Sequence, residues 1–143
     1  MLVTTTIPLP AGPLVVVVKD FWPPAHPYNV ETITASYVPN TNSSGIRLFN
    51  LSPDTKSAGI QAGGTTLADN VLYTLGSVWV DIPQGAETFS VFDDATKKAL
   101  ATDTTSPPSA PFVFTNFLIG LQNATAGSTY ATRVVPLIDA PEA

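Results

Sequence analysis

The clearest strand signal in the chain is Val78-Trp79-Val80-Asp81-Ile82. Successive side chains of a strand point to opposite faces, so its two valines and its isoleucine share one face, while Trp79 and Asp81 share the other. The turn signal Pro83-Gln84-Gly85 follows, and a second alternating run covers residues 88–93. We therefore expect a β-hairpin here, with the valine and isoleucine face toward the core and a loop of about four or five residues.

The same pattern of short β-branched and aromatic runs between breakers continues along the chain, which contains 14 prolines and nine glycines. It predicts an all-β fold: a two-layer antiparallel β-sandwich of the immunoglobulin or transthyretin-like kind, with about 8–10 short strands. Gly63-Gly64-Thr65-Thr66 and Asp93–Lys97 are expected to be turns. The predicted strands are Pro13–Lys19, Glu31–Tyr37, Gly45–Asn50, Ala58–Ala62, Asn70–Leu75, Ser77–Ile82, Thr88–Asp93, Lys98–Asp103, Phe112–Leu121 and Thr132–Ile138.

The N-terminal part differs from the remainder in organisation. Residues 1–43 hold one apolar strand, Pro13–Lys19, and a proline-rich extension, Trp22–Pro27; residues 44–143 form the expected sandwich domain. The stretch Pro13–Asp20 resembles Thr132–Asp139, since both are apolar runs closed by an aspartate. Three interpretations follow: it is the tail of a preceding repeat, it is a strand exchanged within or between subunits, or two strands of one sandwich are alike by composition. An exposed edge of four valines invites aggregation, so we expect this strand to be covered.

Composition limits the partners. Charged residues make up 12% of the chain and the net charge is −5, with six scattered Lys and Arg residues. A nucleic-acid binder needs a basic stripe, so nucleic acid is excluded as a partner, and no apolar run approaches the ~20 residues that span a bilayer. The chain has no cysteine. Low charge with many hydroxyls favours a secreted, particle-bound or self-associating protein, so we expect an extracellular, cell-surface or periplasmic location although the chain shows no signal peptide.

The segment Gly45-Ile46-Arg47-Leu48-Phe49-Asn50-Leu51-Ser52-Pro53-Asp54 carries a family resemblance, and Val80–Gly85 continues it. Together they resemble domain-of-unknown-function family 4397, small secreted or cell-surface β-sandwich domains that occur singly or in tandem. A distantly similar sandwich occurs in a periplasmic accessory protein of alginate acetylation. The resemblance covers roughly residues 44–139, and it implies no catalytic or binding residue. Independently of it, Ser52 and Asp54 flank a proline turn and are expected to cap backbone N–H groups.

Catalytic and metal-binding residues are scarce. His26 is the only histidine and lies between prolines, and no Gly-x-Ser-x-Gly elbow accompanies it. The pair Asp93-Asp94 is explained by a solvated turn; a calcium site there with Asp69 or Asp103 would lack the usual loop. We expect no enzymatic activity, no cofactor and no metal.

The leading hypothesis is a non-enzymatic structural or adhesive module of a surface, extracellular or self-assembled structure, such as one unit of a tandem repeat. Self-association or a neighbouring repeat would be its partner. The alternative is a carbohydrate- or polysaccharide-associated binding domain that uses exposed tryptophans. Glycosylation is permitted at Asn42 and Asn123, whereas Asn50 lies inside a strand. The candidate assembly or binding contacts are Leu14, Val16, Val18, Trp22, Tyr28 and Trp79.

Overall fold

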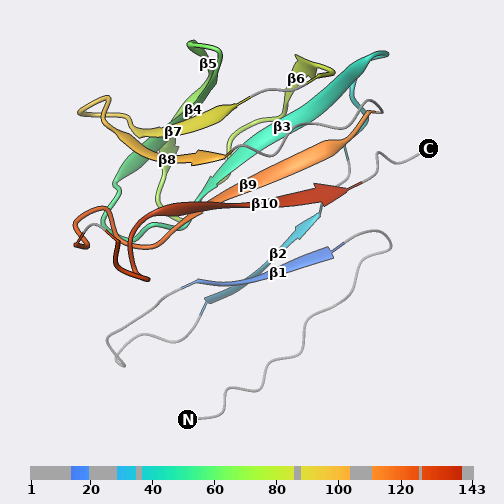
Figure 1. Ribbon diagram of the computed structural model, residues 1–143. Coiled ribbons are helices and arrows are strands. Elements are labelled where there is room, and N and C mark those ends of the chain that lie inside the picture. Colours follow the sequence, from blue (N-terminus) through green and yellow to red (C-terminus); the bar gives the residue numbers. More distant parts are fainter. Residues whose placement is uncertain are drawn as a thin grey trace. The chain divides into compact units, whose positions relative to one another are not determined.

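A computed structural model describes residues 14–19, 29–34, 37–85, 88–103, 111–125 and 127–139. Every regular element in these residues is a β-strand (Figure 1). The ten strands are β1 (Leu14–Lys19), β2 (Asn29–Thr34), β3 (Ser43–Asn50), β4 (Ser57–Ala62), β5 (Thr65–Leu72), β6 (Val80–Pro83), β7 (Phe89–Asp93), β8 (Ala99–Asp103), β9 (Val113–Ile119) and β10 (Arg133–Asp139).

The chain divides into two compact units, Met1–Ser36 and Tyr37–Ala143. In the first unit, β1 and β2 form a two-stranded antiparallel sheet in which Val16 is opposite Thr32 and Val18 is opposite Val30. Among the described strands, β2 is the only one that pairs with β1.

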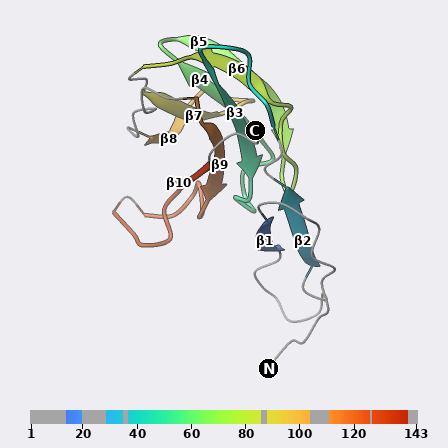
Figure 2. The same ribbon diagram turned by 90° about the vertical axis from the view of Figure 1, so that its right-hand side faces the viewer.

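The second unit is a sandwich of two four-stranded sheets, with the strand orders β10-β9-β3-β6 and β5-β4-β7-β8. Figures 1 and 2 show the two sheets as separate layers. Neighbouring strands are antiparallel except β3 and β9, which run parallel with Leu48 beside Asn116. The all-β sandwich predicted from the sequence is therefore confirmed, with one parallel pair inside it.

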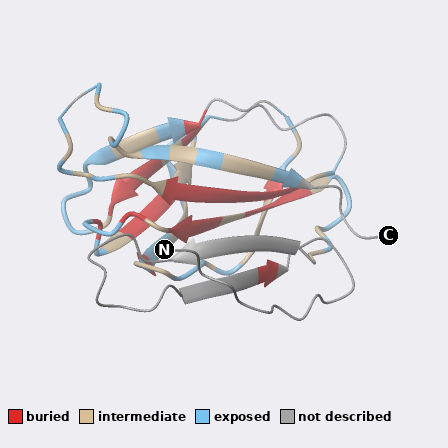
Figure 3. Cartoon of the chain, turned by 90° about the horizontal axis from the view of Figure 1, so that it is seen from below, coloured by how far each residue is buried: buried red, intermediate tan, exposed pale blue. Residues whose placement is uncertain are grey.

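The core lies between the two sheets and is made by alternate residues of the central strands. Ile46 and Leu48 of β3 meet Ile60 of β4 and Phe89 and Val91 of β7, and all five are at most 1% exposed. Figure 3 shows buried residues along these strands and exposed ones in the connecting loops. Burying each such side chain stabilises the fold by about 1.5–3 kcal/mol.

The hairpin predicted across residues 77–93 is wrong. β6 pairs with β3 in one sheet, and β7 pairs with β4 and β8 in the other, so Pro83–Gly85 opens a crossover between layers. Both strands do put apolar residues into the core, since Ile82 and Val91 belong to one cluster. The error arises because a proline and glycine turn has the same composition whether the chain returns within its sheet or passes to the facing one.

Two other turn predictions are confirmed. Gly63 and Gly64 join β4 to β5 with φ of 53° and 83°, a left-handed conformation that glycine adopts without strain, whereas Thr65 and Thr66, also expected in this turn, already belong to β5. Asp93–Lys97 joins β7 to β8, and the N–H of Lys97 donates to the carbonyl of Asp93 at 2.8 Å.

Candidate functional site

Trp79 lies on the face of its sheet opposite the core, as predicted from the alternation. β3 and β6 are paired with Gly45 beside Asp81 and Ile46 beside Val80, and Arg47 and Trp79 are the next residues beyond the last of these pairs. The rings of Tyr37 and Trp79 are stacked at 5.0 Å with 14° between their planes, and Cζ of Arg47 is 4.2 Å from the Trp79 ring centroid. We call Tyr37, Arg47 and Trp79 the aromatic cluster.

Gly45 makes room for this cluster. A Cβ at this position would collide with the ring of Tyr37, so only glycine lets that ring lie on β3. The hydroxyl of Tyr37 donates to Oδ1 of Asp81 at 3.0 Å, and the N–H of Asn40 donates to Oδ2 at 3.2 Å. Loss of water raises the pKa of Tyr37, and its hydrogen bond to the Asp81 carboxylate raises it further. The Tyr37–Asn40 segment is thereby fastened to β6.

Arg47 is held in the same way. Its Nε donates to Oγ1 of Thr115 at 3.0 Å, and burial lowers the pKa of its guanidinium to about 10. All three members of the aromatic cluster are half-buried and packed on one another. The ring faces and polar groups of the cluster are therefore engaged in internal contacts. Such an arrangement is typical of a structural element.

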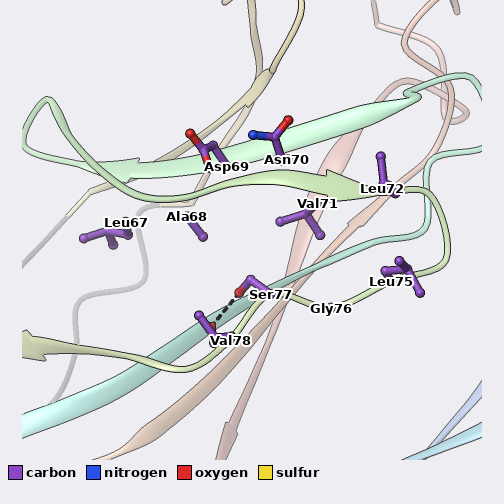
Figure 4. A pocket seen from close by; sticks show the side chains of 10 residues that line it. All are labelled: Leu67, Ala68, Asp69, Asn70, Val71, Leu72, Leu75, Gly76, Ser77 and Val78. Atoms are coloured by element: carbon purple, nitrogen blue, oxygen red, sulfur yellow. Dashed lines mark hydrogen bonds between the residues drawn. The ribbon is translucent and has the colours of Figure 1, made fainter.

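A second feature, which the sequence did not reveal, is a groove beside β5. A cavity of ≈ 340 Å³ lies between this strand and the segment Leu75–Val78 (Figure 4). The residues that line this β5 groove are Leu67, Ala68, Asp69, Asn70, Val71, Leu72, Leu75, Gly76, Ser77 and Val78. Figure 4 shows Leu67, Ala68 and Val71 on the side of β5 that faces Ser77 and Val78, and Asp69 and Asn70 on the other side.

Three apolar residues of the β5 groove are exposed, Leu72 to 48%, Leu75 to 51% and Val78 to 78%, whereas Val71 is buried. The sequence placed Val78 on the core face with Val80 and Ile82, and this is wrong. Regular strand begins only at Val80, because the preceding residues follow the edge of β3 irregularly, with the N–H of Ser77 donating to the carbonyl of Leu48 at 2.8 Å. Val78 therefore lies outside the regular strand, and its side chain does not follow the alternation of Val80 and Ile82.

The acidic turn Asp93–Lys97 uses its carboxylates internally. Asp93 accepts bonds from the N–H and the hydroxyl of Thr96, both at 2.7 Å, and these bonds lower its pKa. Asp94 pairs with Lys97 at 2.6 Å, which lowers the pKa of that carboxyl as well. No cluster of His, Cys, Asp or Glu in the described part of the chain has the geometry to hold a metal ion.

The Ser52–Asp54 turn ties distant loops together. Asp54 accepts from the N–H groups of Gln122 and Asn123 at 2.7 and 3.0 Å, which confirms it as a cap, although of a remote loop. Asn50, fully buried, donates to the carbonyls of Thr55 and Val71 at 2.9 and 3.1 Å and accepts from the N–H of Ser52 at 3.1 Å.

Some of the remaining residues predicted as assembly or binding contacts lie in the described part of the chain, and others do not. Leu14, Val16 and Val18 lie in β1, opposite residues of β2. Trp22, His26 and Tyr28 lie outside the described residues. Of the possible glycosylation sites, Asn42 and Asn123 are exposed and Asn50 is not.

Within the part of the chain that the structure describes, there is no helix with the length and hydropathy of a membrane span. No family model matches the chain and no curated protein matches it, so the resemblance to family 4397 stays a prediction.

Proposed function

We propose that this protein is a non-enzymatic structural module that assembles with copies of itself in a surface or extracellular structure. The observation that carries the proposal is the N-terminal unit. β1 is a run of leucine and four valines closed by Lys19, and it belongs to a separate two-stranded sheet.

Such a unit is too small to be stable by itself. A two-stranded sheet is marginal in water, and chains below about 40 residues need disulfides, metals or association to fold. The unit Met1–Ser36 has no cysteine to form a disulfide. Because consecutive residues of a strand point to opposite faces, four successive valines make β1 apolar on both faces, a pattern of strands covered on both sides. Association with another chain supplies such cover.

Carbohydrate binding ranks second. Sugar recognition by stacking needs an open aromatic face, whereas Trp79 is stacked on Tyr37 and packed against Arg47. A glycan array probed with the wild type and with Trp79→Ala separates the two functions, and a Trp79-dependent signal would favour the carbohydrate function.

Size-exclusion chromatography with light scattering tests the assembly proposal. We expect the mass of the wild type to rise with concentration, and we expect Val16→Asp, which puts a charge in the middle of β1, to abolish the rise. Val38→Asp is the matched control, because Val38 is 69% exposed in the other unit. A wild type of constant monomeric mass would contradict the proposal.

A further inference from the structure

The sandwich has four edge strands, β6, β10, β5 and β8, and three of them carry features that prevent pairing with another chain. β6 has four residues and ends at Pro83, β10 has Pro136 in its middle, and β8 has five residues and directly follows Lys97 and Lys98. Short length, proline and lysine are among the ways in which natural sheets protect their edges.

β5 lacks these features. It is eight residues long and contains neither proline nor lysine, Thr65-Thr66-Leu67-Ala68-Asp69-Asn70-Val71-Leu72. A β-bulge also protects an edge, and β5 has one at Asp69 and Asn70, where the register with β4 shifts and φ of Asn70 is 53°; these two side chains lie on the other side of β5 from Leu67, Ala68 and Val71. The β5 groove runs along this edge, so the backbone groups of the edge lie beside the exposed side chains of Leu72, Leu75 and Val78.

The groove and β1 are chemically complementary. Leu72, Leu75 and Val78 line the groove and are 48–78% exposed, and β1 supplies four valines. Asp69 is the only charged residue of β5, and Lys19 is the only charged residue of β1. An extended segment that adds to a sheet edge gains affinity from main-chain bonds and specificity from side chains in adjoining pockets.

We propose that β1 of one copy docks on the β5 edge of a second copy, with valine side chains in the β5 groove and Lys19 near Asp69. This inference rests on the proposed function and names its partner and its surface. Each copy then has one donor strand and one acceptor groove. Copies can then join head to tail into rings or filaments, or two copies can exchange strands in a closed pair.

The acceptor side is tested with the full-length double variant Leu75→Glu/Val78→Glu. Both residues are at least half exposed, so the change leaves the core intact, and two charges in the groove should weaken assembly at least about tenfold. Val38→Glu and Tyr130→Glu are matched controls, because these residues are 69% and 70% exposed and lie outside the groove; they should assemble as the wild type does.

Complementation tests donor and acceptor together. Val16→Asp keeps its groove and loses its donor strand, while Leu75→Glu/Val78→Glu keeps its donor and loses its groove. Each should be monomeric alone, and an equimolar mixture should form a heterodimer that grows no further. A charge exchange gives a further readout: Lys19→Glu and Asp69→Lys should each weaken assembly roughly 1.5- to 5-fold, and the two together should restore it.

The outcomes distinguish this inference from the proposed function. If the groove variant assembles like the wild type while Val16→Asp does not, the groove is not the acceptor and the inference fails, but the assembly function stands. If the wild type is monomeric at every concentration, both fail. Assembly that is lost in the groove variant, kept in the controls and restored by mixing supports both.

Discussion

The guanidinium of Arg47 lies against the indole of Trp79, with Cζ of Arg47 4.2 Å from the ring centroid. This contact joins β3 to the segment that precedes β6, where regular pairing has ended. Tyr37 stacks on the same indole and is bonded to Asp81, so the start of the sandwich is fastened to its edge strand. Trp79, which the sequence suggests as a possible binding residue, is therefore part of the architecture.

Trp79→Ala should lower the free energy of unfolding by about 2–3 kcal/mol, because it removes a half-buried ring, an aromatic pair and a cation–π contact. Urea unfolding measures the change. Truncation of the exposed Tyr130 to alanine is the control and should stay within about 0.5 kcal/mol of the wild type. In a double-mutant cycle, Arg47→Ala and Trp79→Ala should couple by about 0.5–1 kcal/mol. Additive effects would show that the contact contributes no energy of its own.

Asn50→Val should destabilise the sandwich by about 3 kcal/mol. Asn50 is fully buried and its amide makes three hydrogen bonds to the backbone, so valine leaves two carbonyls and one N–H without partners in the interior. Chemical denaturation measures the loss. A cost below about 1 kcal/mol would mean that the backbone relaxes to find other partners.

Asn116→Val should have the opposite effect on the free energy of unfolding. Asn116 is equally buried, but its side-chain oxygen and nitrogen have no hydrogen-bond partner among the described residues. Replacing an unsatisfied buried amide by an apolar side chain removes a desolvation cost, so we expect stabilisation of about 1–2 kcal/mol. The same substitution at two fully buried asparagines then separates hydrogen bonding from volume. Destabilisation at both positions would contradict this interpretation.

Acid should destabilise the protein through its aspartates. Burial alone would raise the pKa of Asp54, but bonds from the N–H groups of Asn123 and Gln122 outweigh it and lower the pKa; those of Asp93 and Asp94 are lowered as well. A carboxyl whose pKa is lower in the folded state contributes stability above its unfolded pKa, about 3.9, and loses it as pH falls through the folded value. The free energy of unfolding should therefore be level above about pH 5 and fall below it. Asp54→Asn should reduce this slope in urea unfolding at several pH values, and an unchanged slope would contradict the assignment.

Strand positions were largely predictable from the sequence, because alternation and breakers are local. The run Ala58–Ala62 and the glycine turn after it correspond to β4 and its turn. Sheet membership was not predictable: β6 and β7 lie in different layers although a compact turn follows β6. Nor was the parallel pairing of β3 with β9, since it joins segments far apart in the chain and leaves no local signal.

The candidate surfaces were also predictable only where the sequence signal is local. Trp79 was placed on the correct face by alternation, but its partners Tyr37 and Arg47 are tertiary contacts. The β5 groove was missed because Val78 was assigned to the core face, and only the irregular path of Ser77 along β3 exposes it.

The mass of the full-length protein in solution, measured by light scattering from low to high micromolar concentration, tests the central claim most directly. The proposed assembly predicts a mass that rises with concentration above the 15.0 kDa monomer, and a return to the monomer mass in Leu75→Glu/Val78→Glu and in Val16→Asp. A wild type that stays at the monomer mass throughout would contradict it.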